Sequence, residues 1–375
     1  MAANTPPDLW PDAFLDAMRD VGDPIADTAV RKVYAEGLLG PANQLLQLLV
    51  HNDQLPMDKL PPGLHDYLHS TGTFPPWADR AKIRRGEEIF GQYAFQVVTA
   101  LFCASLPAAY AARRGVQVLH RTARLETTPR RRIVETAQFV VDVMARGGLE
   151  PGGAGVRDTQ KVRLLHAAVR YLVAESGRWD HAALGLPINQ EDMAGTVLTF
   201  SHVVLESFGK LGVSLSRADE EAYLHVWNVI GYLLGVDERL LAHDMMQARE
   251  LRAHIERRQF AASPEGRELT QALLGLMEYA LPGTLFDGMP AMLMRYLGGN
   301  QVADLLGVPV DTDWTRHLRG PLRWLVGEAS LAEGESRAFA RLCELFSRKL
   351  VEGLLFVDRG PERVPFRLPA GLGQG

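Results

Sequence analysis

Apolar residues recur at intervals of three and four positions along most of this chain, and the strict alternation typical of strands is scarce. The longest helical patterns cover residues 82–106, 129–146, 161–173, 189–212 and 216–235. Four or five further helical patterns follow before the C-terminal tail. The spacing therefore predicts an all-α protein.

Residues that favour helix ends mark several of these boundaries. Asn189 and Ser216 stand directly before helical runs, where their side chains can accept a hydrogen bond from the first turn. Thr128 before Pro129 combines an N-cap with the residue that best tolerates the first helical position. Gly235 follows the run that Ser216 opens and supplies its stop. We expect helices to begin and end at these residues.

The helical patterns are not evenly distributed. Short ones alternate with proline-rich turns up to about residue 80, and the tail after Arg359 is rich in proline and glycine. We therefore expect one globular unit with three parts. An N-terminal helical extension (1–80) packs on the core (81–310), and C-terminal helices and a loose tail (311–375) follow.

Composition narrows the class of protein. The chain has 375 residues, of which 47% are hydrophobic, and 40 basic residues are balanced by 45 acidic ones for a net charge of −5. Such a balance offers no basic field for nucleic acid. The only two cysteines, Cys103 and Cys343, stand in apolar helical patterns, which argues against a disulfide scaffold and against a cysteine-built zinc or iron–sulfur site.

The N-terminal residues, MAANTPPDLWPDAFLDAM, lack the basic and apolar regions of a signal peptide. The longest apolar run, LFCASLPAAYAA, is shorter than a bilayer requires and contains Pro107. These features predict a soluble, cytoplasmic protein with no membrane span, secreted only if a signal peptide has been removed.

One helical segment, KVRLLHAAVRYLV, carries the most specific chemistry. Arg163, His166 and Arg170 are three and four residues apart, so they share one stripe of a helix that is otherwise apolar. Buried guanidinium groups need anionic partners. Those partners can be protein carboxylates, with a core histidine bonded to a carbonyl. They can also be the two propionates of a haem whose iron is bound by His166, and without a CxxCH motif such a haem is b-type.

The preceding helical pattern holds a second pair. Arg132 and Thr136 are four residues apart and lie on one helix face. They can be a solvated arginine and a helix-facing threonine, or a cation and a hydroxyl that hydrogen-bond dioxygen on the distal side of a haem.

The remaining candidates are weaker. His65 and His69 have the i, i+4 spacing of zinc ligands but lack the glutamate of an HExxH motif, and prolines crowd the segment. His202 and His225 stand on amphipathic helices, where a core or interface histidine is the default. No GxSxG, CxxC or GxGxxG motif occurs, which argues against the usual hydrolase, dithiol and dinucleotide-binding classes.

These residues resemble those of the latex-clearing-protein type of rubber oxygenase and of the wider oxygenase family that includes the mycophenolate-pathway enzyme. The resemblance covers about residues 80–310. The family's Arg-x2-His-x3-Arg motif matches Arg163, His166 and Arg170, and its distal arginine and threonine match Arg132 and Thr136.

The resemblance implies a globin-like helical core that binds haem b, with His166 as the proximal iron ligand and Arg163 and Arg170 as cofactor-binding residues. It implies a haem-dependent oxygenase that uses dioxygen to cleave a C=C bond of an apolar isoprenoid or alkenyl substrate to carbonyl products, as a monomer or homodimer. A haem-binding sensor or carrier, a haem peroxidase-like enzyme and a cofactor-free helical scaffold are the alternatives.

One position departs from the family. Latex-clearing proteins commonly carry a lysine directly before the distal threonine, where it can cap the iron, and this chain has Glu135 there. A lysine-capped form therefore cannot arise, and Glu135 is a candidate acid or base at the distal face, or a solvated side chain. The family's proposed catalytic glutamate has no counterpart in RRGVQVLHRTARL, which precedes Glu126.

Overall fold

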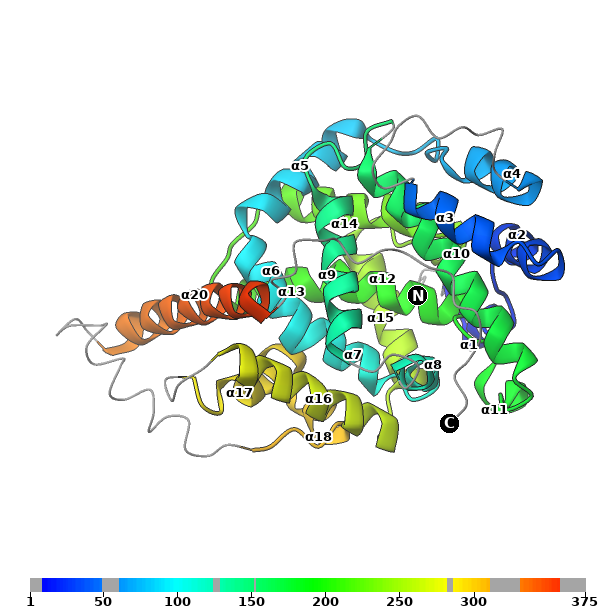
Figure 1. Cartoon of the computed structure of the whole chain (residues 1–375). Coiled ribbons are helices and arrows are strands. Elements are labelled where there is room, and N and C mark those ends of the chain that lie inside the picture. Colours follow the sequence, from blue (N-terminus) through cyan, green and yellow to red (C-terminus); the bar gives the residue numbers. More distant parts are fainter. Residues whose placement is uncertain are drawn as a thin grey trace, which may run out of the picture.

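The computed structural model describes residues 9–48, 61–123, 129–151, 153–281, 286–310 and 331–357, and confirms the predicted all-α class (Figure 1). Within these ranges there is no strand, only an isolated bridge between Ala112 and Phe260. The helices are α1 (Asp12–Met18), α2 (Pro24–Ala35), α3 (Leu39–Leu48), α4 (Pro62–Thr71), α5 (Arg80–Gln92), α6 (Ala94–Ala100), the π-turn η2 (Leu101–Ser105), α7 (Leu106–Ala111), α8 (Val116–Ala123), α9 (Pro129–Met144), α10 (Ala154–Glu175), α11 (His181–Leu184), α12 (Gln190–Phe200), α13 (His202–Lys210), α14 (Arg217–Leu233), the 3-10 turn η3 (Glu238–Leu240), α15 (Met245–Gln259), α16 (Pro264–Ala280), α17 (Met289–Gly298), α18 (Asn300–Leu305) and α20 (Leu331–Val357).

Three apolar clusters hold these helices together. The first surrounds α14, whose Trp227 and Ile230 are buried against α5 and α12. The second joins η2, α16, α17 and α20, and includes both cysteines as buried residues of the helices predicted for them. The third is formed where α2 and α4 pack on α10. In Figure 1 the N-terminal helices, in blue, lie beside the green α10.

The single helix expected over residues 82–106 is wrong, because the chain leaves the helical conformation at Tyr93 and two helices cover this range. α5 ends at Gln92, and Tyr93 leaves the helical conformation with φ −115° and ψ 27°. The chain then continues helically through α6, η2 and α7, with Leu106 N donating to Leu101 O across the wider π-turn. This turn lies just before Pro107, which has no N–H to donate. Apolar periodicity persists on both sides of Tyr93, which is why the break was not evident in the pattern.

The helical segment that follows Tyr93 is longer than the apolar run LFCASLPAAYAA. Ala94–Ala111 forms 18 helical residues of mean hydropathy 1.5, which is long and apolar enough to cross a bilayer. Within the molecule 61% of that window is buried, as in the core helix of a globular protein. It is weak evidence for a membrane span.

The predicted helix ends agree with the structure where they are described. The side chains of Asn189 and Ser216 each accept a hydrogen bond from the first turn of their helix, and α14 ends before Gly235, whose φ is +84°. α9 begins at Pro129 as expected. Thr128 and the tail after Arg359 lie outside the described residues.

Candidate functional site

The helix α10, which carries Arg163, His166 and Arg170, has two different sides. On one side Leu164, Ala167 and Ala168 are buried against the N-terminal helices α2 and α4. The other side is only half-buried although it is mostly apolar; its members are Val162, Leu165, His166, Val169 and Leu172. Apolar side chains that stay half-exposed in the middle of a long helix are typical of a surface that receives an apolar partner.

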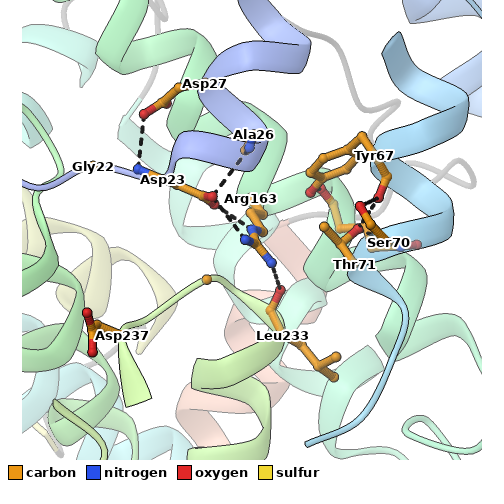
Figure 2. A network of polar contacts seen from close by, with 12 residues as sticks. Gly22, Asp23, Ala26, Asp27, Tyr67, Ser70, Thr71, Arg163, Leu233 and Asp237 are labelled. Carbon is orange, nitrogen blue, oxygen red and sulfur yellow. Dashed lines mark hydrogen bonds and ion pairs between the residues drawn. The ribbon is translucent and has the colours of Figure 1, made fainter. Parts of the chain in front are cut away.

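Arg163 has a protein carboxylate as its partner. Its Nη2 donates to Asp23 Oδ1 over 2.9 Å, its Nε donates to Asp23 Oδ2, and its Nη1 lies 3.5 Å from the carbonyl of Leu233 (Figure 2). Burial alone would lower the pKa of Arg163, but the hydrogen bonds and charge of Asp23 outweigh it and raise that pKa. All three nitrogens have protein partners, so the alternative of a protein carboxylate is observed for Arg163. A guanidinium has five N–H donors, and binding of a haem propionate by Arg163 stays a prediction. Asp23 is 140 residues away in sequence, so helical spacing could not identify it.

Arg170 makes a similar ion pair about two helical turns further along α10. Its Nε donates to Asp27 Oδ1 over 2.8 Å, and its Nη1 donates to the carbonyl of Ile188 over 2.8 Å. Its buried Nη2 has no hydrogen-bond partner among the described residues. The alternative of protein carboxylates is thus observed for Arg170 as well, although one nitrogen remains for another acceptor.

Both carboxylates come from the first turn of α2. Asp23 is the N-cap of this helix, where its side chain accepts from Ala26 N over 3.3 Å, and Pro24 follows at the first helical position. The Asp23 backbone N–H donates to Asp27 Oδ2 over 3.0 Å, which ties the two acidic residues to each other. The start of α2 therefore presents two carboxylates, four residues apart, to the two arginines of α10.

His166 lies between these two ion pairs and is half-buried. Its Nδ1 atom is buried. The side of α10 on which His166 lies is otherwise apolar, so the imidazole is the one nitrogen-bearing side chain among its half-buried members, and imidazole is the commonest metal ligand in proteins.

The helix α9, which packs against α10, carries the other candidate residues. Val140 and Val143 on its inner side are 2% and 0% exposed. Thr136 lies on the same side, four and seven residues earlier, yet it is exposed, and Glu135 beside it is half-buried. Arg132 belongs to the same stripe of α9, but its side chain lies outside the described part of the structure. The inner side of α9 is therefore covered towards its C-terminus and open at Thr136.

A buried polar contact sets the relative level of the two helices. Asp142 of α9 hydrogen-bonds Asp158 of α10, and Lys161 lies 3.4 Å from Asp158. Burial, opposed by Lys161 but reinforced by Asp142, raises the pKa of Asp158 to about 6. From this contact α9 runs back along the chain and α10 runs forward. Thr136 lies six residues before Asp142, and Leu164 lies six residues after Asp158, so these two residues are at about the same height along the helix pair. Thr136 and His166 are thus within one helical turn of the same level.

The connection between α9 and α10 is held by α5. Gly147 N donates to Glu87 Oε2 over 3.0 Å, and Arg80 Nη1 donates to the carbonyl of Leu149 over 2.8 Å. Burial raises the pKa of Glu87, while hydrogen bonds from the connection oppose that shift. The C-terminal end of α9 and the N-terminal end of α10 are therefore both held in place by α5.

Four other histidines, His65, His120, His202 and His225, have polar neighbours within the described residues. His65 Nδ1 lies 3.4 Å from the neighbouring Asp66, and no group of three or more metal-ligating side chains occurs in the described ranges. His202 is buried beside Arg252, which contributes with burial to lowering its pKa to about 4. His225 Nε2 accepts from Asp79 N over 2.9 Å, and His120 lies 2.9 Å from Glu268.

Four acidic residues of the site were not identified from the sequence: Asp23, Asp27, Asp142 and Asp158. A signal existed for the first two, because an acidic pair at i, i+4 complements an arginine pair on a neighbouring helix. Nothing in the local sequence, however, indicates which helix α2 packs against.

Known proteins are similar to this chain in sequence and fold. Residues 88–329 match the family described as "ER-bound oxygenase mpaB/B'/Rubber oxygenase, catalytic domain". A rubber oxygenase of Streptomyces sp. (strain K30) is 28% identical over 300 residues, covering 77% of this chain and 71% of that protein. The structure of latex clearing protein LCP in the closed state matches with a TM-score of 0.77 and 26% identity, covering 94% of this chain and 95% of that one. The matched range includes α9 and α10, and the resemblance seen in their motifs is confirmed: this chain belongs to the oxygenase family that contains the mpaB-type and rubber oxygenases.

Proposed function

We propose that this chain is a haem b-dependent oxygenase that uses dioxygen to cleave a C=C bond of an isoprenoid or alkenyl substrate. Addition of both oxygen atoms across the double bond produces two carbonyl groups, so atoms and electrons balance without an external reductant. The single observation that carries the proposal is the pairing of a half-buried His166 on α10 with an open inner side of α9 at Thr136. Membership of an oxygenase family supports the same chemistry.

The residues around His166 fit a haem. The imidazole of His166 would provide the nitrogen donor, and the half-buried Val162 and Val169 would provide apolar contacts for a porphyrin face. Arg170 keeps one buried nitrogen for a propionate, and Arg163 bonds Asp23 and Leu233 through three of its five N–H groups, which leaves it a candidate for the other propionate. When bound, haem supplies the iron centre that activates dioxygen.

On the opposite side the proposal assigns hydrogen bonding to Arg132 and Thr136. A guanidinium and a hydroxyl that converge on dioxygen stabilise negative charge as the oxygen reacts. Glu135 occupies the position next to Thr136 and is the candidate acid or base there. Because it replaces the lysine common in latex-clearing proteins, the distal face has no ammonium group at this position.

The substrate class follows from the lining. The described side chains on the open side of α10 are aliphatic apart from His166, which favours a hydrocarbon chain over a charged substrate. The matched relatives are named for rubber and latex, and an oligo-isoprenoid or smaller alkenyl chain is the substrate that we infer for this protein.

The first test is whether the purified protein carries haem through His166. The wild type should show a Soret band and about one haem per chain, and His166→Ala should abolish stoichiometric haem because the iron loses its nitrogen ligand. His181→Ala is the matched control, since His181 is exposed and lies 3.6 Å from Asp20, away from this site. Full haem retention in His166→Ala would place the ligand elsewhere, and a colourless wild type would reject the haem proposal.

A further inference from the structure

We propose that Asp23 and Asp27 are positioning residues for the haem-binding helix, although both lie outside the matched catalytic domain of residues 88–329. The inference rests on the proposed function, since it assigns to α2 the task of holding His166 in place. On this inference, the N-terminal helices help to fix the position of the iron ligand.

The two ion pairs hold α10 on both sides of His166. Arg163 precedes His166 by three residues and Arg170 follows it by four, so the ion pairs lie on either side of the turn that carries the imidazole. Two points seven residues apart on an α-helix are separated by roughly 10 Å along its axis. A helix attached to a rigid neighbour at two such points can neither rotate nor slide without breaking a charge pair.

Both ion pairs are largely buried. The side chains of Arg163 and Asp23 are 10% and 2% exposed, and those of Arg170 and Asp27 are 5% and 22% exposed. Removal of one partner leaves a guanidinium group buried without its counter-charge, which is far more costly than the loss of a surface ion pair. The pairs therefore oppose any separation of α2 from α10.

The helix α2 is itself fixed. It packs against α4, and α4 is bonded to the same face of α10. Tyr67 Oη donates to the carbonyl of Gln160 over 2.7 Å, and Gln160 Nε2 donates to the carbonyl of Leu68 over 2.8 Å. In Figure 2, Tyr67 and Thr71 lie beside the Asp23–Arg163 pair. Together these helices form a layer behind His166, on the side away from α9.

The decisive variant is Asp23→Asn. Asparagine is an equally good N-cap, so α2 should still begin correctly while Arg163 loses its counter-charge. We expect the rate at which haem is lost to an excess of a haem-scavenging protein to rise by about tenfold or more, the scale of a broken buried charge pair. The control is Asp16→Asn, which removes an N-terminal charge that pairs with Arg258 rather than with α10. It should change the rate by less than about twofold, because the Asp16 side chain is 66% exposed and Arg258 keeps Glu191 as a buried partner.

A rescue distinguishes positioning from a general loss of stability. In Asp23→Asn/Arg163→Gln no guanidinium is left unpaired, so haem loss should be slower than in Asp23→Asn alone. The absorption spectrum of the double variant should return towards that of the wild type. Equal haem-loss rates for Asp23→Asn and Asp16→Asn, or a double variant that loses haem faster than Asp23→Asn alone, would overturn the proposal.

The same variants can be examined without haem. In the haem-free protein, Asp23→Asn should raise hydrogen exchange in residues 161–173 of α10, and Asp16→Asn should not. If the wild type takes up no haem, the proposed function fails while this measurement still decides whether α2 holds α10. If the wild type holds haem and neither the exchange nor the haem-loss rate responds to Asp23→Asn, the positioning role alone is rejected.

Discussion

The polar residues around His166 lie in two places. Arg163 and Arg170 are bound to carboxylates of α2. Thr136 is exposed on α9 with the half-buried Glu135 beside it, and these are the residues to which we assign a part in the reaction. Residue type alone did not distinguish these roles, because a buried arginine beside a histidine is compatible with either a propionate or a carboxylate partner.

At this scale the distal assignment can be tested in Arg132 and Thr136. Arg132→Ala should leave haem content near that of the wild type but slow the consumption of dioxygen and alkene by roughly ten- to a thousandfold, the usual effect of losing one positioned donor. Thr136→Val should also slow turnover, whereas Thr136→Ser keeps the hydroxyl and should retain most of it. Oxygen-electrode rates, divided by haem content, provide the measurement.

Arg217→Ala is the matched control for Arg132→Ala, because the side chain of Arg217 is 87% exposed at the start of α14. It should have wild-type rates. If Arg132→Ala loses activity only in proportion to lost haem, the residue holds no reacting group, and a haem carrier or sensor becomes the better description of this protein.

At the scale of elements, the site depends on how α9 meets α10. Their contact includes Asp142 and Asp158, a pair of carboxylates with Lys161 alongside. The folded state holds the proton of Asp158 more tightly than the unfolded state, because its pKa is raised from 3.8 to about 6, chiefly by burial. The stabilisation from this proton is fully present below about pH 4 and is lost as the pH rises through 6.

Asp158→Asn should remove that dependence, since asparagine stays neutral. The Tm of Asp158→Asn minus the Tm of the wild type should therefore increase as the pH is raised from 4 to 7. Asp219→Asn should show the opposite sign, because the hydrogen bond from Arg85 lowers the pKa of Asp219 and its stabilisation is lost on acidification. Thermal melts from pH 4 to 7 measure the effect at Asp158, and melts below about pH 4, where Asp219 takes up its proton, measure the effect at Asp219. A pH-independent difference between Asp158→Asn and the wild type would contradict the assignment.

At the scale of the whole molecule, N-terminal residues are built into the core rather than appended to it. Glu191, at the start of α12 and 0% exposed, accepts from Arg19, which follows α1, and from Arg258 and Gln259 of α15. Trp10 Nε1 donates to the carbonyl of Arg239 over 2.7 Å. The extension therefore meets the core both here and at α10.

Glu191→Gln tests this junction. It leaves two arginines short of a buried counter-charge, and we expect a loss of about 3–5 kcal/mol in the free energy of unfolding, the range for breaking a buried ion pair. Glu88→Gln is the control, because its pair with Arg85 is exposed, and about 0–1 kcal/mol is expected. Chemical denaturation measures both, and similar losses in the two variants would mean that Glu191 contributes no more than a surface charge.

Local chemistry was sufficient for the parts of this protein that depend on neighbours in sequence. Helical periodicity determined the all-α class, and Asn189 and Ser216 determined where α12 and α14 begin, because caps and amphipathic faces involve residues within a few positions. The motifs around His166 and Thr136 were specific enough to indicate the oxygenase family.

Tertiary structure decided what the arginines bind, where the long apolar pattern breaks, and which side of α10 is open. Asp23 and Arg163 are 140 residues apart, and their contact exists only because α2 packs on α10. The break at Tyr93 lies inside an uninterrupted apolar pattern, so only the packing of α5 and α6 against their neighbours could reveal it. Helical spacing determines which side chains share a face, whereas the partner of that face depends on the packing of the whole chain.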